Sequence, residues 1–125
     1  MKMYEIVAFN DFYINHISQQ QISISVAYKV NKIMQAIKTD LEFYQSELQK
    51  IFDDCVEQEN GLYKRTEDQK NFIIKADSIE EFEQRYTDLQ QFEVTFDDDL
   101  KLDVEAFEGL EVSPQEILNI TNFLK

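Results

Sequence analysis

An uninterrupted heptad repeat is the feature of this sequence that most constrains its fold. Eight residues follow one another at steps of four, three, four, three, four, three and four, which gives a period of 3.5 residues over nearly four heptads. No glycine or proline interrupts the repeat before Asn60-Gly61, a dipeptide that indicates a stop and a turn. The stripe consists of Val30, Met34, Ile37, Leu41, Tyr44, Leu48, Ile51 and Cys55.

The repeat predicts one long helix from about Ser23 to about Glu57. At 1.5 Å per residue this helix spans about 50 Å, whereas a compact chain of 125 residues has a radius of gyration of about 14 Å. We therefore expect part of the helix to extend beyond its own domain or to pair with another copy. Two interpretations stay open: the stripe is only the central helix of an α+β core, or it also drives self-association.

Shorter elements are predicted on both sides of the long helix. Residues Val7–Ser18 suit a short helix, with a strand over Tyr4–Phe9 as the alternative. Leu62-Tyr63 and Phe72–Ile74 favour β-structure, and the polar segment Lys64–Lys70 between them suits a hairpin loop or an exposed excursion.

Two capping boxes predict helix starts in the second half of the chain. Ser78 with Glu81 begins an amphipathic helix, and Ser113 with Glu116 begins a terminal helix that has Pro114 at its first position.

Alternating apolar residues between these two helices predict a small sheet. Phe92–Phe96 alternates as a half-buried strand does, and Leu100–Val104 alternates again, which would complete a hairpin. The predicted fold class is α+β: one long central helix, two or three shorter helices and a small antiparallel sheet. We expect a single domain over 1–125, with an N-terminal segment over 1–21, the long helix within 22–58 and an acidic α+β part over 62–125.

Charge is distributed unevenly along the chain. The net charge is −13, from 12 basic and 25 acidic residues. Residues 1–52 are balanced, while residues 77–116 hold 14 acidic side chains against only Arg85 and Lys101. Such a charge repels phosphate, which argues against direct nucleic-acid binding. No apolar run approaches the ~20 residues of a membrane span, so we expect no membrane partner.

Candidate catalytic and metal-binding residues are few. His16 and Cys55 are the only histidine and the only cysteine, so they cannot form a zinc site alone, and Cys55 lies on the apolar stripe. Asp97-Asp98-Asp99 resembles the start of a calcium loop, but Leu102 stands where that loop needs glycine. We expect no catalytic residue, no metal and no cofactor, and hence no enzyme.

The order of elements resembles a known group of proteins over about residues 20–125. The N-terminal segment and residues Lys64–Asn71 fit that pattern poorly. The residues that carry the resemblance are Val26–Val30, Glu59–Gly61, Glu80–Phe82, Phe92–Phe96 and Gly109–Pro114. The chain is similar to a family of small acidic proteins of tailed bacteriophages and prophages, often encoded among virion-morphogenesis genes. The resemblance implies a phage origin.

Two functions are expected from these observations. The first is a non-enzymatic phage protein that acts by protein–protein contact, as a homo-oligomer or with phage structural proteins, in virion or tail assembly. The alternative is an acidic inhibitor that mimics a nucleic acid and binds a basic host protein, such as a defence nuclease. Either would act in the host cytoplasm or the virion. The acidic contact surface predicted for the second function is Asp97, Asp98, Asp99, Asp103, Glu105 and Glu108.

Overall fold

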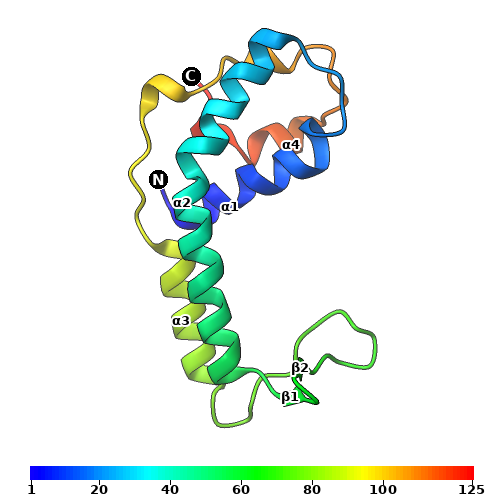
Figure 1. Ribbon diagram of the computed structural model, residues 1–125, viewed down its shortest axis with the longest axis vertical. Coiled ribbons are helices and arrows are strands. Elements are labelled where there is room, and N and C mark those ends of the chain that lie inside the picture. Colours follow the sequence, from blue (N-terminus) through cyan, green and yellow to red (C-terminus); the bar gives the residue numbers. More distant parts are fainter. The chain divides into compact units, whose positions relative to one another are not determined.

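A computed structural model describes all 125 residues of the chain (Figure 1). It contains a long helix, several shorter helices and one two-stranded antiparallel sheet, which confirms the predicted α+β class. The chain divides into two compact units. Unit 1 comprises Met1–Leu41 and Glu93–Lys125, and unit 2 comprises Glu42–Phe92.

The long helix α2 runs from Ile24 to Cys55 without a break, within two residues of its predicted ends. Its 32 residues correspond to about 48 Å at the usual rise. The first part of α2 belongs to unit 1 and the last part to unit 2, so one apolar stripe supplies the cores of both units. None of the helices is both long enough and apolar enough to cross a membrane.

Unit 1 begins with helix α1, Met3–Phe12, which continues into a π-helical turn over Tyr13–Ile17. The alternative strand over Tyr4–Phe9 is therefore wrong. The helix starts four residues before its predicted beginning because the Glu5 side chain accepts a hydrogen bond from the Lys2 backbone N–H at 2.7 Å. Side chains spaced three residues apart along α1 are all buried: Met3, Ile6, Phe9 and Phe12.

The C-terminal part of unit 1 contains only short elements. They are the 3₁₀ turns Asp98–Leu100 and Val104–Phe107, helix α4 over Pro114–Leu118, and a last 3₁₀ turn over Thr121–Phe123. The capping box predicted before α4 is confirmed, because Ser113 and Glu116 exchange backbone-to-side-chain hydrogen bonds of 3.0 and 3.2 Å.

The predicted hairpin of Phe92–Phe96 with Leu100–Val104 does not form. Glu93 instead makes an isolated bridge with Lys2, and Leu102 makes one with Leu124. The turn between the two segments is a 3₁₀ turn in which the Asp97 carboxylate accepts the Asp99 N–H at 2.9 Å. Of the alternating apolar side chains, Val94 and Leu102 are buried, whereas Phe92 and Val104 are 51% and 53% exposed.

Aromatic rings fill the core of unit 1. Phe9 of α1 lies 4.4 Å from Phe123 between ring centroids, and Phe96 lies 5.0 Å from Phe123. Phe12 meets Phe107 edge to face at 5.5 Å. These contacts join α1 to the last residues of the chain, and they explain why a segment with so little regular structure is held in place.

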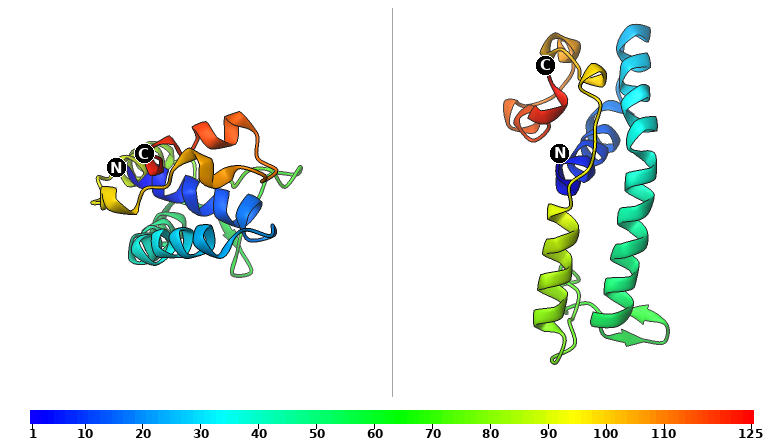
Figure 2. Two further views of the ribbon diagram at one scale, coloured as in Figure 1. Left: turned by 90° about the horizontal axis from the view of Figure 1, so that it is seen from above. Right: turned by 90° about the vertical axis from the view of Figure 1, so that its left-hand side faces the viewer.

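Unit 2 is a helical hairpin with a β-extension. The end of α2 and helix α3, Ile79–Gln91, run antiparallel and side by side in both side views (Figures 1 and 2). Strands β1, Gln58–Glu59, and β2, Leu62–Tyr63, are joined by the two-residue turn Asn60-Gly61. Both turn residues have positive φ, 54° and 79°, as a type I′ turn requires.

The chain after β2 forms a second, longer hairpin, which confirms the hairpin-loop prediction for this region. Arg65 bridges Phe72, and the Ile73 N–H donates to the Lys64 carbonyl at 3.0 Å. At the start of α3, however, Ser78 makes no side-chain cap. The capping-box prediction fails there because Glu81 is engaged elsewhere, by Cys55 at 3.0 Å and by Arg85 at 3.7 Å.

Candidate functional site

An aromatic face on the helical hairpin of unit 2 is the first candidate site. Phe43 of α2 and Phe92 at the end of α3 lie with ring centroids 5.7 Å apart, and their side chains are 43% and 51% exposed. They border a groove of about 230 Å³ whose floor includes the buried Ile51 and Leu89. We call Phe43, Phe92 and this groove the aromatic face. Charged side chains complete its lining, namely Glu47, Arg85 and Asp88.

Polar links between α2 and α3 hold the aromatic face in shape. The Gln90 amide donates to the Tyr44 hydroxyl at 2.9 Å. The Arg85 guanidinium donates to the Asp54 carboxylate at 2.8 Å, and this interaction raises the pKa of Arg85 further. Phe52 and Phe82 pack between the helices with centroids 5.9 Å apart. The two rings of the aromatic face are therefore carried by helices whose relative position is fixed at both ends.

Cys55 and His16 have separate partners. Cys55 is fully buried, and its thiol donates to the Glu81 carboxylate at 3.0 Å. Burial, and then this hydrogen bond, raise the pKa of the thiol above its ordinary value. His16, in the π-helical turn of unit 1, is half-buried and its Nδ1 lies 3.6 Å from Glu116. Neither residue is thus arranged to activate the other as a nucleophile and base.

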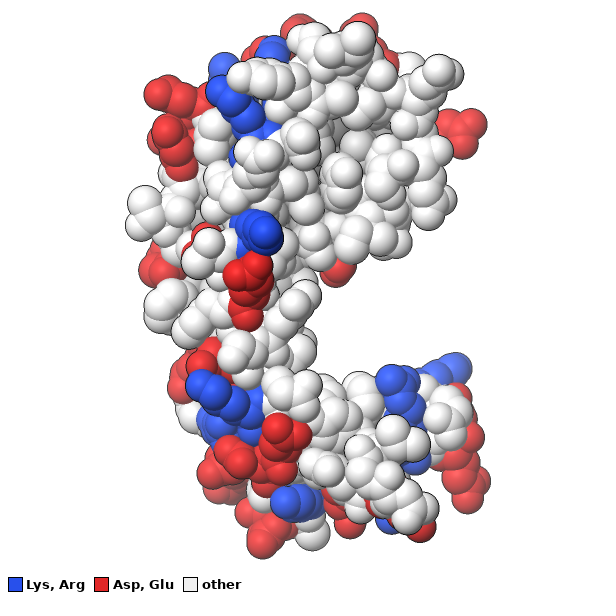
Figure 3. All heavy atoms as spheres, viewed as in Figure 1, with Lys and Arg blue, Asp and Glu red and all other residues white.

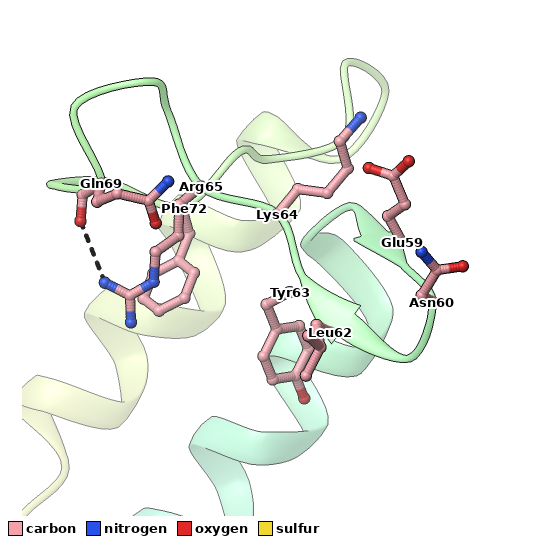
Figure 4. Close-up of a pocket in the computed structure, with 8 residues that line it drawn as sticks. All are labelled: Glu59, Asn60, Leu62, Tyr63, Lys64, Arg65, Gln69 and Phe72. Atoms are coloured by element: carbon pink, nitrogen blue, oxygen red, sulfur yellow. Dashed lines mark hydrogen bonds between the residues drawn. The ribbon is translucent and has the colours of Figure 1, made fainter.

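A pocket beside the β-strands is the second candidate site (Figure 4). It measures about 620 Å³, the largest of those described here. Tyr63 and Phe72 supply aromatic surface, and Arg65 lies over the Phe72 ring, 4.3 Å from its centroid. Arg65 also donates to the Gln69 carbonyl at 3.2 Å. The remaining lining residues are Glu59, Asn60, Leu62, Lys64 and Gln69, and we call the whole the β-hairpin pocket.

The acidic contact surface predicted from the sequence lies in the two 3₁₀ turns of unit 1 and beside them. All six carboxylates are exposed. Asp97 is occupied as a cap, and Asp98 pairs with Lys101 at 3.0 Å. The other four make no hydrogen bond or ion pair through their side chains: Asp99, Asp103, Glu105 and Glu108.

The heptad stripe is divided between core and partly open positions. Val30, Ile37, Ile51 and Cys55 are buried within the chain. The other four stripe residues are half-buried: Met34, Leu41, Tyr44 and Leu48. Half of the stripe residues therefore belong to the core of the chain itself. The surface of α2 that remains open to a partner includes Phe43, which is not a stripe residue but lies beside the stripe.

Sequence reasoning did not identify the aromatic face or the β-hairpin pocket. Two sequence features could have indicated the pocket: the Asn60-Gly61 turn, which predicts a hairpin, and the basic residues Lys64 and Arg65 that follow it. Phe43 and Phe92 gave no such signal, since their proximity depends on how α3 packs on α2. Comparison of the chain with protein-family models, with curated proteins and with solved structures finds no match.

Proposed function

We propose that this protein acts by binding other proteins, first of all further copies of itself, as a non-enzymatic component or accessory of phage virion or tail assembly. The observation that carries the proposal is the aromatic face of unit 2. The phage context comes from the sequence resemblance, and the physical argument for binding comes from the exposed rings.

Large aromatic side chains that border a groove, as Phe43 and Phe92 do, belong to the residue types that often dominate binding energy at an interface. Burying the exposed half of one phenylalanine contributes about 2 kcal/mol at ~25 cal/mol per Å² of apolar surface. A charged rim around an apolar centre is the usual composition of a protein interface, and Glu47, Arg85 and Asp88 supply one. The separate carboxylate partners of Cys55 and His16 also favour binding over nucleophilic catalysis.

Light scattering coupled to size exclusion tests this proposal. At micromolar concentration and ~0.15 M salt, the wild-type mass should be at least twice 14.9 kDa. Phe43→Glu combined with Phe92→Glu should lower that mass, because both changes place a carboxylate in the interface.

A matched control separates this effect from added charge. Ile24→Glu with Tyr28→Glu adds the same two charges at positions of α2 that are 90% and 62% exposed, and it should keep the wild-type mass. A wild-type protein that is monomeric at every accessible concentration would refute self-association. An unchanged mass in the Phe43/Phe92 variant would show that the aromatic face is not the contact.

The exposure of the acidic contact surface favours a second function, inhibition of a basic host protein. Asp98 pairs with Lys101 and Asp97 caps a 3₁₀ turn, so the other four carboxylates are open to a basic cleft. Pull-down from an extract of phage-infected host cells with wild type and with Asp97→Asn/Asp98→Asn/Asp99→Asn tests it. Capture of a basic nucleic-acid-binding protein by wild type alone would favour inhibition, and capture of phage structural proteins by both would favour assembly.

A further inference from the structure

The hairpin that contains the β-hairpin pocket is locally basic in a strongly acidic chain. Residues 64–75 hold Lys64, Arg65, Lys70 and Lys75, which are four of the seven bases in residues 53–125, against Glu67 and Asp68. We call residues 64–75 the cationic loop. In Figure 3 blue and red side chains lie together on this loop, at the lower right of the view.

Arg65 is held in a geometry that suits carboxylate recognition. Its guanidinium stacks on Phe72 at 4.3 Å, and one N–H donates to the Gln69 carbonyl at 3.2 Å. These two contacts fix the plane of the group and leave most of its five N–H donors without a protein acceptor. A planar guanidinium held in this way binds a carboxylate through two parallel hydrogen bonds at little cost in side-chain entropy.

None of the four bases of the cationic loop has an acidic partner, and Lys75 donates to the Asp54 backbone carbonyl at 3.2 Å. Lys64, Arg65 and Lys70 form no ion pair within 4 Å, although the chain has 25 acidic residues. Elsewhere in the chain some bases are paired, such as Arg85 with Asp54 and Lys101 with Asp98, and others on α2, such as Lys29 and Lys38, are not. Lys64 and Arg65 line the pocket together with the aromatic rings of Tyr63 and Phe72. The pocket therefore combines two unpaired cations with apolar walls, which suits an acidic peptide segment.

The chain itself contains a segment of that chemistry. Residues 97–108 hold six exposed carboxylates, of which only Asp98 is paired with a base. Leu100 and Val104 interrupt the acids, and Val104 is 53% exposed, so the segment also offers apolar atoms to the rings of a pocket. We call residues 97–108 the acidic segment.

We propose that the β-hairpin pocket binds the acidic segment of a second copy of this chain. The inference rests on the self-association proposed above and adds a second, polar contact to it. Because the two surfaces differ, the contact is heterologous: each copy has one pocket and one segment to offer. Repetition of such a contact produces a ring or an open chain and not a closed two-fold pair.

Neutral variants on the two sides of the contact test this directly. Lys64→Gln/Arg65→Gln removes the pocket cations, and Asp99→Asn/Asp103→Asn removes two carboxylates that make no side-chain interaction of their own. Each variant alone should lose association through this contact. An equimolar mixture should form a pair and stop there, since one intact pocket meets one intact segment.

The measurement is sedimentation velocity at ~0.15 M salt. At this ionic strength the Debye length is ~8 Å, so the long-range repulsion between two acidic proteins is screened while charges in direct contact still attract each other. All proteins carry Phe43→Glu/Phe92→Glu, so contact through the aromatic face does not contribute. In that background the protein with an intact pocket and segment should sediment as species larger than a pair, increasing with concentration.

Control variants change charge equally at exposed positions that have no partner. Lys29→Gln/Lys38→Gln matches the pocket variant, and Glu42→Gln/Glu83→Gln matches the segment variant. Both should behave as the background protein does. A charge-swapped chain, Lys64→Glu/Arg65→Glu/Asp99→Lys/Asp103→Lys, keeps the net charge of the background protein and should recover self-association.

The outcomes separate this inference from the proposed function. No pairing in the mixture, or the same loss in the control variants, would overturn the pocket–segment contact and leave the aromatic face standing. Pairing in the mixture together with an unchanged mass in the Phe43/Phe92 variant would retain the pocket–segment contact and reject the aromatic face.

Discussion

Removal of the Phe123 ring is the sharpest test of how unit 1 is held together. Phe123 is fully buried, packs on Phe9 at 4.4 Å and on Phe96 at 5.0 Å, and its carbonyl accepts the Leu102 N–H at 2.8 Å. Phe123→Ala leaves the backbone bond possible but opens a cavity between the two remaining rings. Such a change costs about 3–5 kcal/mol, against a total stability of about 5–15 kcal/mol for a typical domain.

The expected result is a large loss of thermal stability. For a chain of this size about 1 kcal/mol corresponds to roughly 3–5 °C, so the melting temperature should fall by about 10–20 °C. Far-UV circular dichroism during heating and in denaturant measures it. Leu118→Ala is the control, because Leu118 is 64% exposed and its loss should change stability by less than about 0.5 kcal/mol. If the two variants melt within a few degrees of each other, the aromatic core described for unit 1 is wrong.

Two further predictions concern titrating groups. Cys55 is buried, and its thiol pKa is raised above 9.0. A thiol reagent at pH 8 should therefore label the native protein at least about 100-fold more slowly than the unfolded protein. Equal labelling rates would contradict the burial of Cys55. The pKa of Glu93 lies below 4.5 because Lys2 and the N-terminal ammonium donate hydrogen bonds to its carboxylate. A lowered folded-state pKa stabilises the protein above pH about 4.5, and this stabilisation is lost as pH falls through the folded pKa. Wild type should therefore be more stable than Glu93→Gln at pH 7, and the free energies of unfolding of the two proteins should converge near pH 2. A stability difference that does not change with pH would refute the pairing of Glu93 with Lys2 and the N-terminal ammonium.

The features that were predictable from sequence are those decided by local pattern. The heptad stripe located α2 to within two residues, since a 3.5-residue period has no other simple explanation. The Ser113–Glu116 box located α4 because both of its hydrogen bonds are made between residues three apart. The capping-box prediction failed at Ser78 because other residues engage the Glu81 carboxylate. Cys55 is distant in sequence, and Arg85 lies one helical turn after Glu81.

Features that depend on distant contacts were not predictable in this way. Alternation in Phe92–Phe96 correctly placed Val94 in the core but wrongly implied that Phe92, which is 51% exposed, is buried too. Period-two patterning does not say whether a strand or a helix lies opposite. The exposure of the six carboxylates in residues 97–108 was predictable because charged side chains are identified directly from the sequence. The aromatic face was not found, because Phe43 and Phe92 are 49 residues apart and meet only through the packing of α3 on α2.

Synthesis from the N-terminus to the C-terminus delays the folding of unit 1. Unit 2 is a continuous stretch that can fold once Phe92 has emerged, whereas unit 1 needs residues from both sides of it. Phe9 and Phe123 are 114 residues apart, so at ~5–20 residues per second Phe123 is synthesised roughly 6–23 s after Phe9. During that interval Phe9 and Phe12 lack the Phe123 and Phe107 rings that pack on them in the folded unit, so this part of α1 is accessible to chaperones or to other chains.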